Sequence, residues 1–126
     1  EIADGLILEA VYDRLLTTVK NRFEAMHTPP TPLAHLLLFW GSIQNRFNAF
    51  SLNPVEYASH VRVPTLMLHG ALDERARISD AHAVYAALPG ERKLVTFEGA
   101  GHQSCLDADS ILWRNEISVF LGNRNR

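Results

Sequence analysis

Residues 64–73 read PTLMLHGALD, and this stretch decides how the chain folds. After Pro64, the five residues 65–69 contain no Asp, Glu, Lys or Arg, which predicts a strand that is buried on both faces. Strands of this kind occur in parallel sheets that helices cover on both sides. Gly70 and Asp73 follow the run, so a small residue and an acid stand on the loop that leaves the predicted strand.

A second strand with a loop after it is predicted further along the chain. Residues 93–97 (KLVTF) predict the strand, and residues 98–102 (EGAGH) form the loop, in which Gly99 and Gly101 come just before His102. A helix is predicted between the two strands, and this order favours a parallel sheet covered by helices. Because working residues sit at the carboxyl ends of parallel strands, we expect Asp73 and His102 at the same edge. A carboxylate beside an imidazole orients the ring and stabilises its protonated form.

These residues resemble the α/β-hydrolase family. The matching segments are 63–70 (VPTLMLHG), Asp73, 84–89 (VYAALP) and 97–102 (FEGAGH). The resemblance is to the serine-aminopeptidase and esterase-like branch, and it implies an α/β fold whose parallel strands are flanked by helices. Because the family's triad follows the chain order Ser…Asp…His, the resemblance implies that Asp73 is the triad acid and His102 the triad base. It further implies no cofactor, and a small-molecule carboxylic ester or small amide as the substrate.

The nucleophile of such a triad is not found in this chain. No serine among the 126 residues stands in a G-x-S-x-G motif, the turn that presents the nucleophile in this family. In the family that turn precedes the strand matched here by residues 5–8, so the resemblance implies a serine upstream of Glu1. We therefore expect residues 1–126 to be a single partial domain, the C-terminal half of an α/β-hydrolase, and to be inactive alone.

Residues 10–60 are predicted to be helical and fall where this family inserts its lid. Apolar residues recur at helical spacing over 15–26 and 33–47, and we expect both stripes to be mostly core. Tyr12 comes just after a predicted strand end, and Trp40 lies in the second stripe. Both are candidates for binding substrate.

Composition excludes several classes of partner. The chain has 12 Lys and Arg against 14 Asp and Glu, a net charge of −2, so it offers no basic surface for nucleic acid or an anionic membrane. Its apolar runs are too short to cross a bilayer. One cysteine allows no internal disulfide, which favours a reducing, cytoplasmic location. The sequence leaves the oligomeric state open.

Two other functions are compatible with the same residues. His69, Asp73 and His102 are types that bind zinc, although their spacing matches no common zinc motif. Alternatively, the chain is a noncatalytic interaction module that uses an exposed edge of its sheet.

Overall fold

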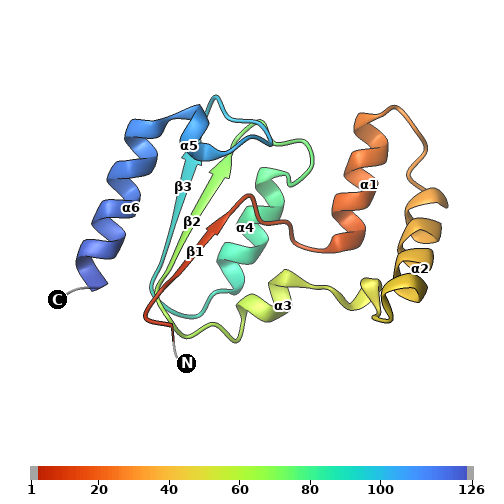
Figure 1. Ribbon diagram of the computed structural model, residues 1–126, viewed down its shortest axis with the longest axis horizontal. Coiled ribbons are helices and arrows are strands. Elements are labelled where there is room, and N and C mark those ends of the chain that lie inside the picture. Colours follow the sequence, from red (N-terminus) through yellow and green to blue (C-terminus); the bar gives the residue numbers. More distant parts are fainter. Residues whose placement is uncertain (1–2, 125–126) are drawn as a thin grey trace.

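The computed structural model of the protein describes residues 3–124. Its three strands and seven helical segments alternate in the order shown in Figure 1. They are β1 (Leu6–Glu9), α1 (Leu15–Ala25), α2 (Leu33–Asn45), the 3-10 helix η1 (Ala49–Ser51), α3 (Pro54–Ala58), β2 (Thr65–Gly70), α4 (Ile78–Ala87), β3 (Arg92–Phe97), α5 (Cys105–Ala108) and α6 (Ser110–Arg124).

The three strands form one parallel sheet in the order β1-β2-β3. Leu6 pairs with Thr65 in one ladder, and Met67 pairs with Leu94 in the other. The central strand β2 is buried along its whole length. The predicted α/β class, with parallel strands flanked by helices, is confirmed.

Successive side chains of β2 point to opposite faces of the sheet, and an apolar cluster lies on each face. On one face, Leu66 and Leu68 pack with strand β3 and with residues of α6 that include Trp113. On the other face, Met67 packs with residues of α3 and α4 that include Val84. Full burial of one such side chain contributes roughly 1.5–3 kcal/mol, so the alternation along β2 fixes which helix covers which face.

Helices α1 and α2 lie to one side of the sheet layer (Figure 1). They pack against each other and against η1. Two polar contacts join α1 to the β2–α4 loop: Asn21 Nδ2 donates to the carbonyl of Arg75 at 3.4 Å, and Arg77 pairs with Glu24 at 2.6 Å. These helices therefore form a small unit that joins the α/β layer through polar contacts.

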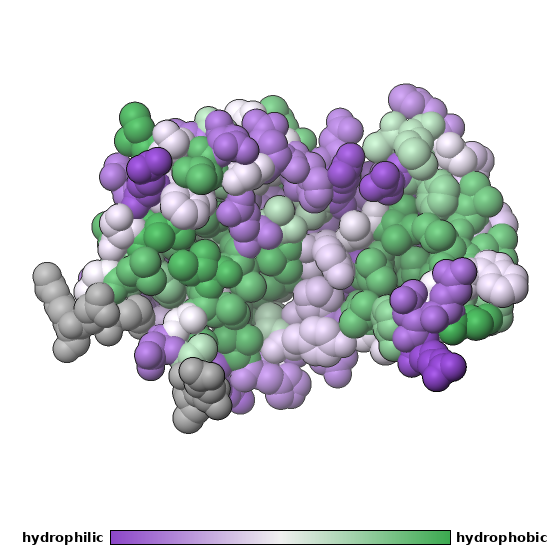
Figure 2. Space-filling model, in the orientation of Figure 1, coloured by the Kyte–Doolittle hydropathy of each residue, from purple (hydrophilic) through white to green (hydrophobic). Residues whose placement is uncertain are grey.

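The expectation that the apolar stripe of α2 is mostly core is wrong. Ala34 and Leu38 are buried, whereas Leu37 and Trp40 are 55% and 59% exposed. The reason is that, among the described residues, α2 packs mainly against α1 and η1, which lie on one side of it. The outward side forms an apolar surface, green in Figure 2 over this end of the molecule. The apolar stripe of α1 is mostly half-buried, and the one buried residue of that helix is the polar Asn21, which lies outside the stripe.

No helix among residues 3–124 is long and apolar enough to cross a membrane.

Candidate active site

The loop after β2 holds Asp73 in a buried position. The residue is 3% exposed, and its Oδ1 accepts two backbone hydrogen bonds, from Arg75 N and Ala76 N, both at 2.9 Å. Aspartate forms such turns readily because its short side chain reaches the amides that follow it. This turn fixes one carboxylate oxygen and leaves the other, Oδ2, for a neighbour.

The loop after β3 is fastened against the loop after β2. Ala71 N donates to the carbonyl of Phe97 at 3.0 Å, and Leu72 N donates to the carbonyl of Ala100 at 2.9 Å. Gly70 lies where the loops meet, and a Cβ atom there would stand 2.5 Å from the carbonyl oxygens of both Ala100 and Gly101. Only glycine permits this approach.

The two loops bring His102 to Asp73. The ring atom Nδ1 of His102 lies 2.8 Å from Asp73 Oδ2, so the contact expected from the sequence is present. The Asp73 side chain is fully buried, whereas that of His102 is 42% exposed. The Nδ1 side of the ring is therefore held by a buried carboxylate, and the rest of the ring is accessible to a reacting group.

Hydrogen bonds keep Asp73 ionised despite its burial. Burial alone raises the pKa of this carboxyl group, but hydrogen bonds from Ala76, His102 and Arg75 outweigh it, and the pKa lies below its ordinary value. An ionised Asp73 accepts a hydrogen bond from the Nδ1–H group of His102, which leaves Nε2 without a proton as the basic atom of the ring. The pair has the chemistry of a general base with an orienting acid.

The structure does not support the metal site. His69 is fully buried, and its Nε2 lies 2.7 Å from the carbonyl oxygen of Ala76. Over residues 3–124, His, Cys, Asp and Glu side chains form no group of three that is able to hold a metal ion. The suggestion that His69, Asp73 and His102 bind zinc is therefore wrong.

An open cavity of about 830 Å³ lies beside Asp73, between α1 and the β2–α4 loop. Asn21 and Glu24 of α1 line it, as does Leu72. Sequence reasoning missed these two α1 residues, because both lie outside the apolar stripe of the helix and no local pattern distinguishes them from other polar surface residues. The two predicted substrate-binding residues lie elsewhere: Tyr12 is half-buried in the β1–α1 connection, Trp40 is exposed on α2, and neither lines this cavity. Their roles stay predictions.

Solved structures of α/β-hydrolases resemble this chain over nearly its whole length. The acylaminoacyl peptidase of Pyrococcus horikoshii matches all of it, with a TM-score of 0.64 and 18% identity. Acetyl xylan esterase 1 from Thermoanaerobacterium matches 94% of it, with a TM-score of 0.61 and 13% identity. The chain has an α/β-hydrolase fold. A hydrolase from Pseudomonas aeruginosa also shares this fold over 94% of the chain, with a TM-score of 0.60 and 19% identity.

The α/β-hydrolase fold is accompanied by similarity in sequence to one curated protein. The uncharacterized peptidase YuxL of Bacillus subtilis is 42% identical over 53 residues, which are 40% of this chain and 8% of that protein. No protein-family model matches the chain. The chain spans only part of its structural relatives: 20% of the Pyrococcus peptidase, 38% of the xylan esterase and 56% of the Pseudomonas hydrolase.

Proposed function

We propose that this chain supplies the acid and the base of a Ser-Asp-His triad in a hydrolase that cleaves a carboxylic ester or a small amide. One observation carries the proposal: His102 Nδ1 lies 2.8 Å from the buried Asp73, at the carboxyl ends of adjacent parallel strands. This is the place and the pairing that acyl-transfer chemistry needs. The hydrolases, esterase and peptidases among the similar proteins support the same class of reaction.

His102 acts first as a base and then as an acid. As the nucleophile's oxygen bonds to the substrate carbonyl carbon, its proton passes to Nε2, and the resulting imidazolium is stabilised by Asp73. The imidazolium then protonates the leaving alcohol or amine as its bond to the acyl group breaks. Water repeats the sequence on the acyl-enzyme and releases the carboxylic acid.

The nucleophile is proposed to be a serine in a G-x-S-x-G turn, about 20–40 residues upstream of Glu1. Without that hydroxyl group no acyl-enzyme forms, so residues 1–126 alone are expected to show no esterase activity above background. Residues 10–60 are proposed to be the lid, with α1 forming the wall of the cavity beside Asp73.

The test is hydrolysis of a short-chain p-nitrophenyl ester by the full product of the gene that encodes this chain. His102→Ala and Asp73→Asn are each expected to lower turnover by roughly 10⁴-fold, because the first removes the base and the second leaves its ring with the wrong tautomer. His82→Ala is the matched control, since His82 is exposed on α4 and should leave turnover unchanged. Turnover that survives His102→Ala would refute the triad. A gene product with neither activity nor an upstream nucleophile would favour the noncatalytic module.

A further inference from the structure

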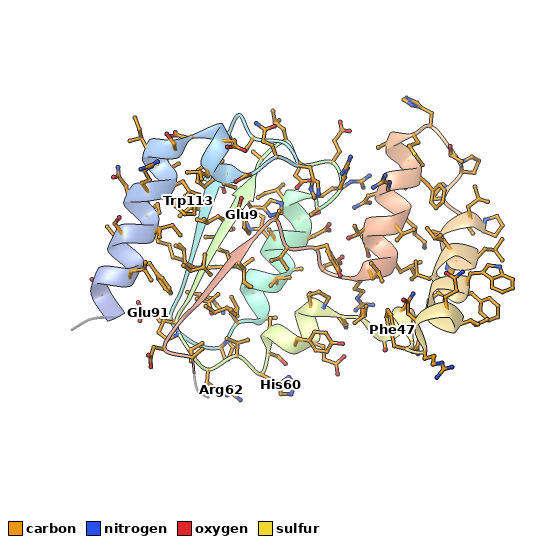
Figure 3. The ribbon with its side chains drawn as sticks, viewed as in Figure 1. Glu9, Phe47, His60, Arg62, Glu91 and Trp113 are labelled. Atoms are coloured by element: carbon orange, nitrogen blue, oxygen red, sulfur yellow. The ribbon has the colours of Figure 1, made fainter. Side chains whose placement is uncertain are left out.

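Glu9, the last residue of β1, joins this strand to the segment that follows His102. Its Oε1 accepts a hydrogen bond from Cys105 N at 2.7 Å, and its Oε2 lies 3.5 Å from Trp113 Nε1. Figure 3 shows Glu9 and Trp113 near each other at the carboxyl edge of the sheet. Cys105 begins α5, three residues after His102. The carboxylate of Glu9 therefore holds the C-terminal end of the loop that carries His102, residues 98–104, called the histidine loop from here on.

The histidine loop is thus held at both ends by different strands. At its start, Ala100 bonds to Phe97 and to Leu72, which ties the loop to β3 and to the loop after β2. At its end, Glu9 ties it to β1. His102 lies between these two anchors, and its ring must stay within hydrogen-bonding reach of Asp73.

The residue that follows Glu9 has an unusual backbone conformation. Ala10 has a φ of 53°, the left-handed conformation that alanine rarely adopts, and its amide still donates to the carbonyl of Leu68 at 3.0 Å. Such strained residues concentrate at functional sites. The thiol of Cys105 is also affected by its contact with Glu9. Burial, followed by the charge and the hydrogen bond of Glu9, raises the pKa of this thiol to about 12.

We propose that Glu9 is a positioning residue that holds His102 against Asp73 by anchoring the end of its loop at Cys105 N. The inference rests on the proposed function, because it assigns Glu9 to the same triad. Glu9 does not touch the reacting atoms: its effect passes through the backbone of residues 102–105. Loss of the anchor misplaces the base, so turnover falls while substrate binding is retained.

Three substitutions of Glu9 separate the effect of side-chain length from the effect of charge. Glu9→Gln keeps the acceptor oxygen at the same distance, Glu9→Asp keeps the charge but is one methylene too short, and Glu9→Ala removes both. In the full gene product, Glu9→Ala and Glu9→Asp are expected to lower kcat for the p-nitrophenyl ester by about 10- to 100-fold with KM unchanged, whereas Glu9→Gln retains most of the activity. Glu98→Ala is the matched control, because Glu98 is an exposed acid on the same loop.

A second readout does not depend on catalysis. The Nδ1 proton of His102, bonded to Asp73, gives a downfield NMR resonance whose exchange with water should quicken in Glu9→Ala and Glu9→Asp but not in Glu9→Gln or Glu98→Ala. A role in stability alone would lower the melting temperature and leave kcat and this resonance unchanged in protein kept well below its melting temperature.

The outcomes of the two proposals differ. If His102→Ala abolishes turnover while all three Glu9 variants keep wild-type kcat and an unchanged His102 resonance, the inference about Glu9 is overturned and the triad stands. If the wild type hydrolyses no ester, or His102→Ala has no effect, the proposed function fails, and the exchange of the ring proton still decides whether Glu9 holds the loop. Should Glu9→Ala not fold, the contrast between Gln and Asp decides.

Discussion

Strand β2 and helix α2 are both strongly apolar in sequence, yet they end in opposite environments. All six residues of β2 are buried. On α2, residues 33–44 contain no Asp, Glu, Lys or Arg, but the only buried residues of the helix are Ala34 and Leu38. The difference lies in their neighbours: β2 has a strand on each side and helices on both faces, whereas α2 packs against α1 and η1.

The contrast shows that an apolar segment is buried only where other helices and strands of the chain pack against it. A central strand has two edges, which pair with neighbouring strands, and two faces, which helices cover, so it is enclosed on four sides. A helix needs a partner on one stripe alone, and α2 obtains it from two small neighbours. Contiguous exposed apolar surfaces of this kind mark places where another surface packs.

The largest expected effect is a direct comparison of the two elements. Leu68→Ala in β2 should lower the free energy of unfolding by about 2–5 kcal/mol, because it opens a cavity in a packed core. Leu37→Ala on α2, where the side chain is exposed, should change it by less than about 0.5 kcal/mol. Both values come from urea unfolding of the full gene product. A cost for Leu37→Ala that matches Leu68→Ala would break the comparison, since it would show that α2 is covered in the complete protein.

A smaller effect is expected at Gly70, where β2 meets the histidine loop. Gly70→Ala should destabilise the protein by about 1–3 kcal/mol, because the new Cβ meets two backbone carbonyl oxygens that cannot rotate away. Gly99→Ala is the control: it is in the same loop region, a Cβ there meets nothing within 4 Å, and stability should hold within about 0.5 kcal/mol. Equal melting temperatures for the two variants would contradict the close approach.

The smallest effect concerns pH and the carboxylate of Asp73, which is buried on the loop after β2. The folded-state pKa of Asp73 is depressed, so its contribution to stability is present above its unfolded pKa of about 3.9 and is lost as pH falls through the lower folded value. Urea midpoints for wild type and Asp73→Asn should therefore converge between about pH 5 and about pH 2. Asp107→Asn, at an exposed acid, serves as the control. A gap between wild type and Asp73→Asn that stays constant over this range would contradict the depressed pKa.

The sequence predicted the features that follow from short-range patterns. The run at 65–69 and the strand at 93–97 predicted the parallel pairs, and parallel strands bring their carboxyl ends to one edge, which placed Asp73 near His102. Contacts across long separations had no such signal. Glu9 and Cys105 are 96 residues apart, and nothing in either local pattern predicts their hydrogen bond.

Burial was predictable only where its cause was local. The stripe of α2 has the spacing of a core helix, and its exposure depends on which elements are present beside it rather than on its own residues. Asn21 shows the reverse case: a polar residue is buried because the β2–α4 loop happens to supply a carbonyl oxygen, that of Arg75. The suggested zinc site failed for a related reason, because His69 faces the backbone of its own loop.

The environment of Cys105 makes the opening of the sheet's carboxyl edge measurable with a simple reagent. Only the thiolate reacts with alkylating agents, and a thiol that is 1% exposed with a pKa of about 12 supplies almost none at neutral pH. Because it is the sole cysteine of the chain, any labelling within these residues comes from molecules in which α5 has left its place. The time course of labelling therefore counts these local unfolding events, and its dependence on reagent concentration separates their frequency from their duration.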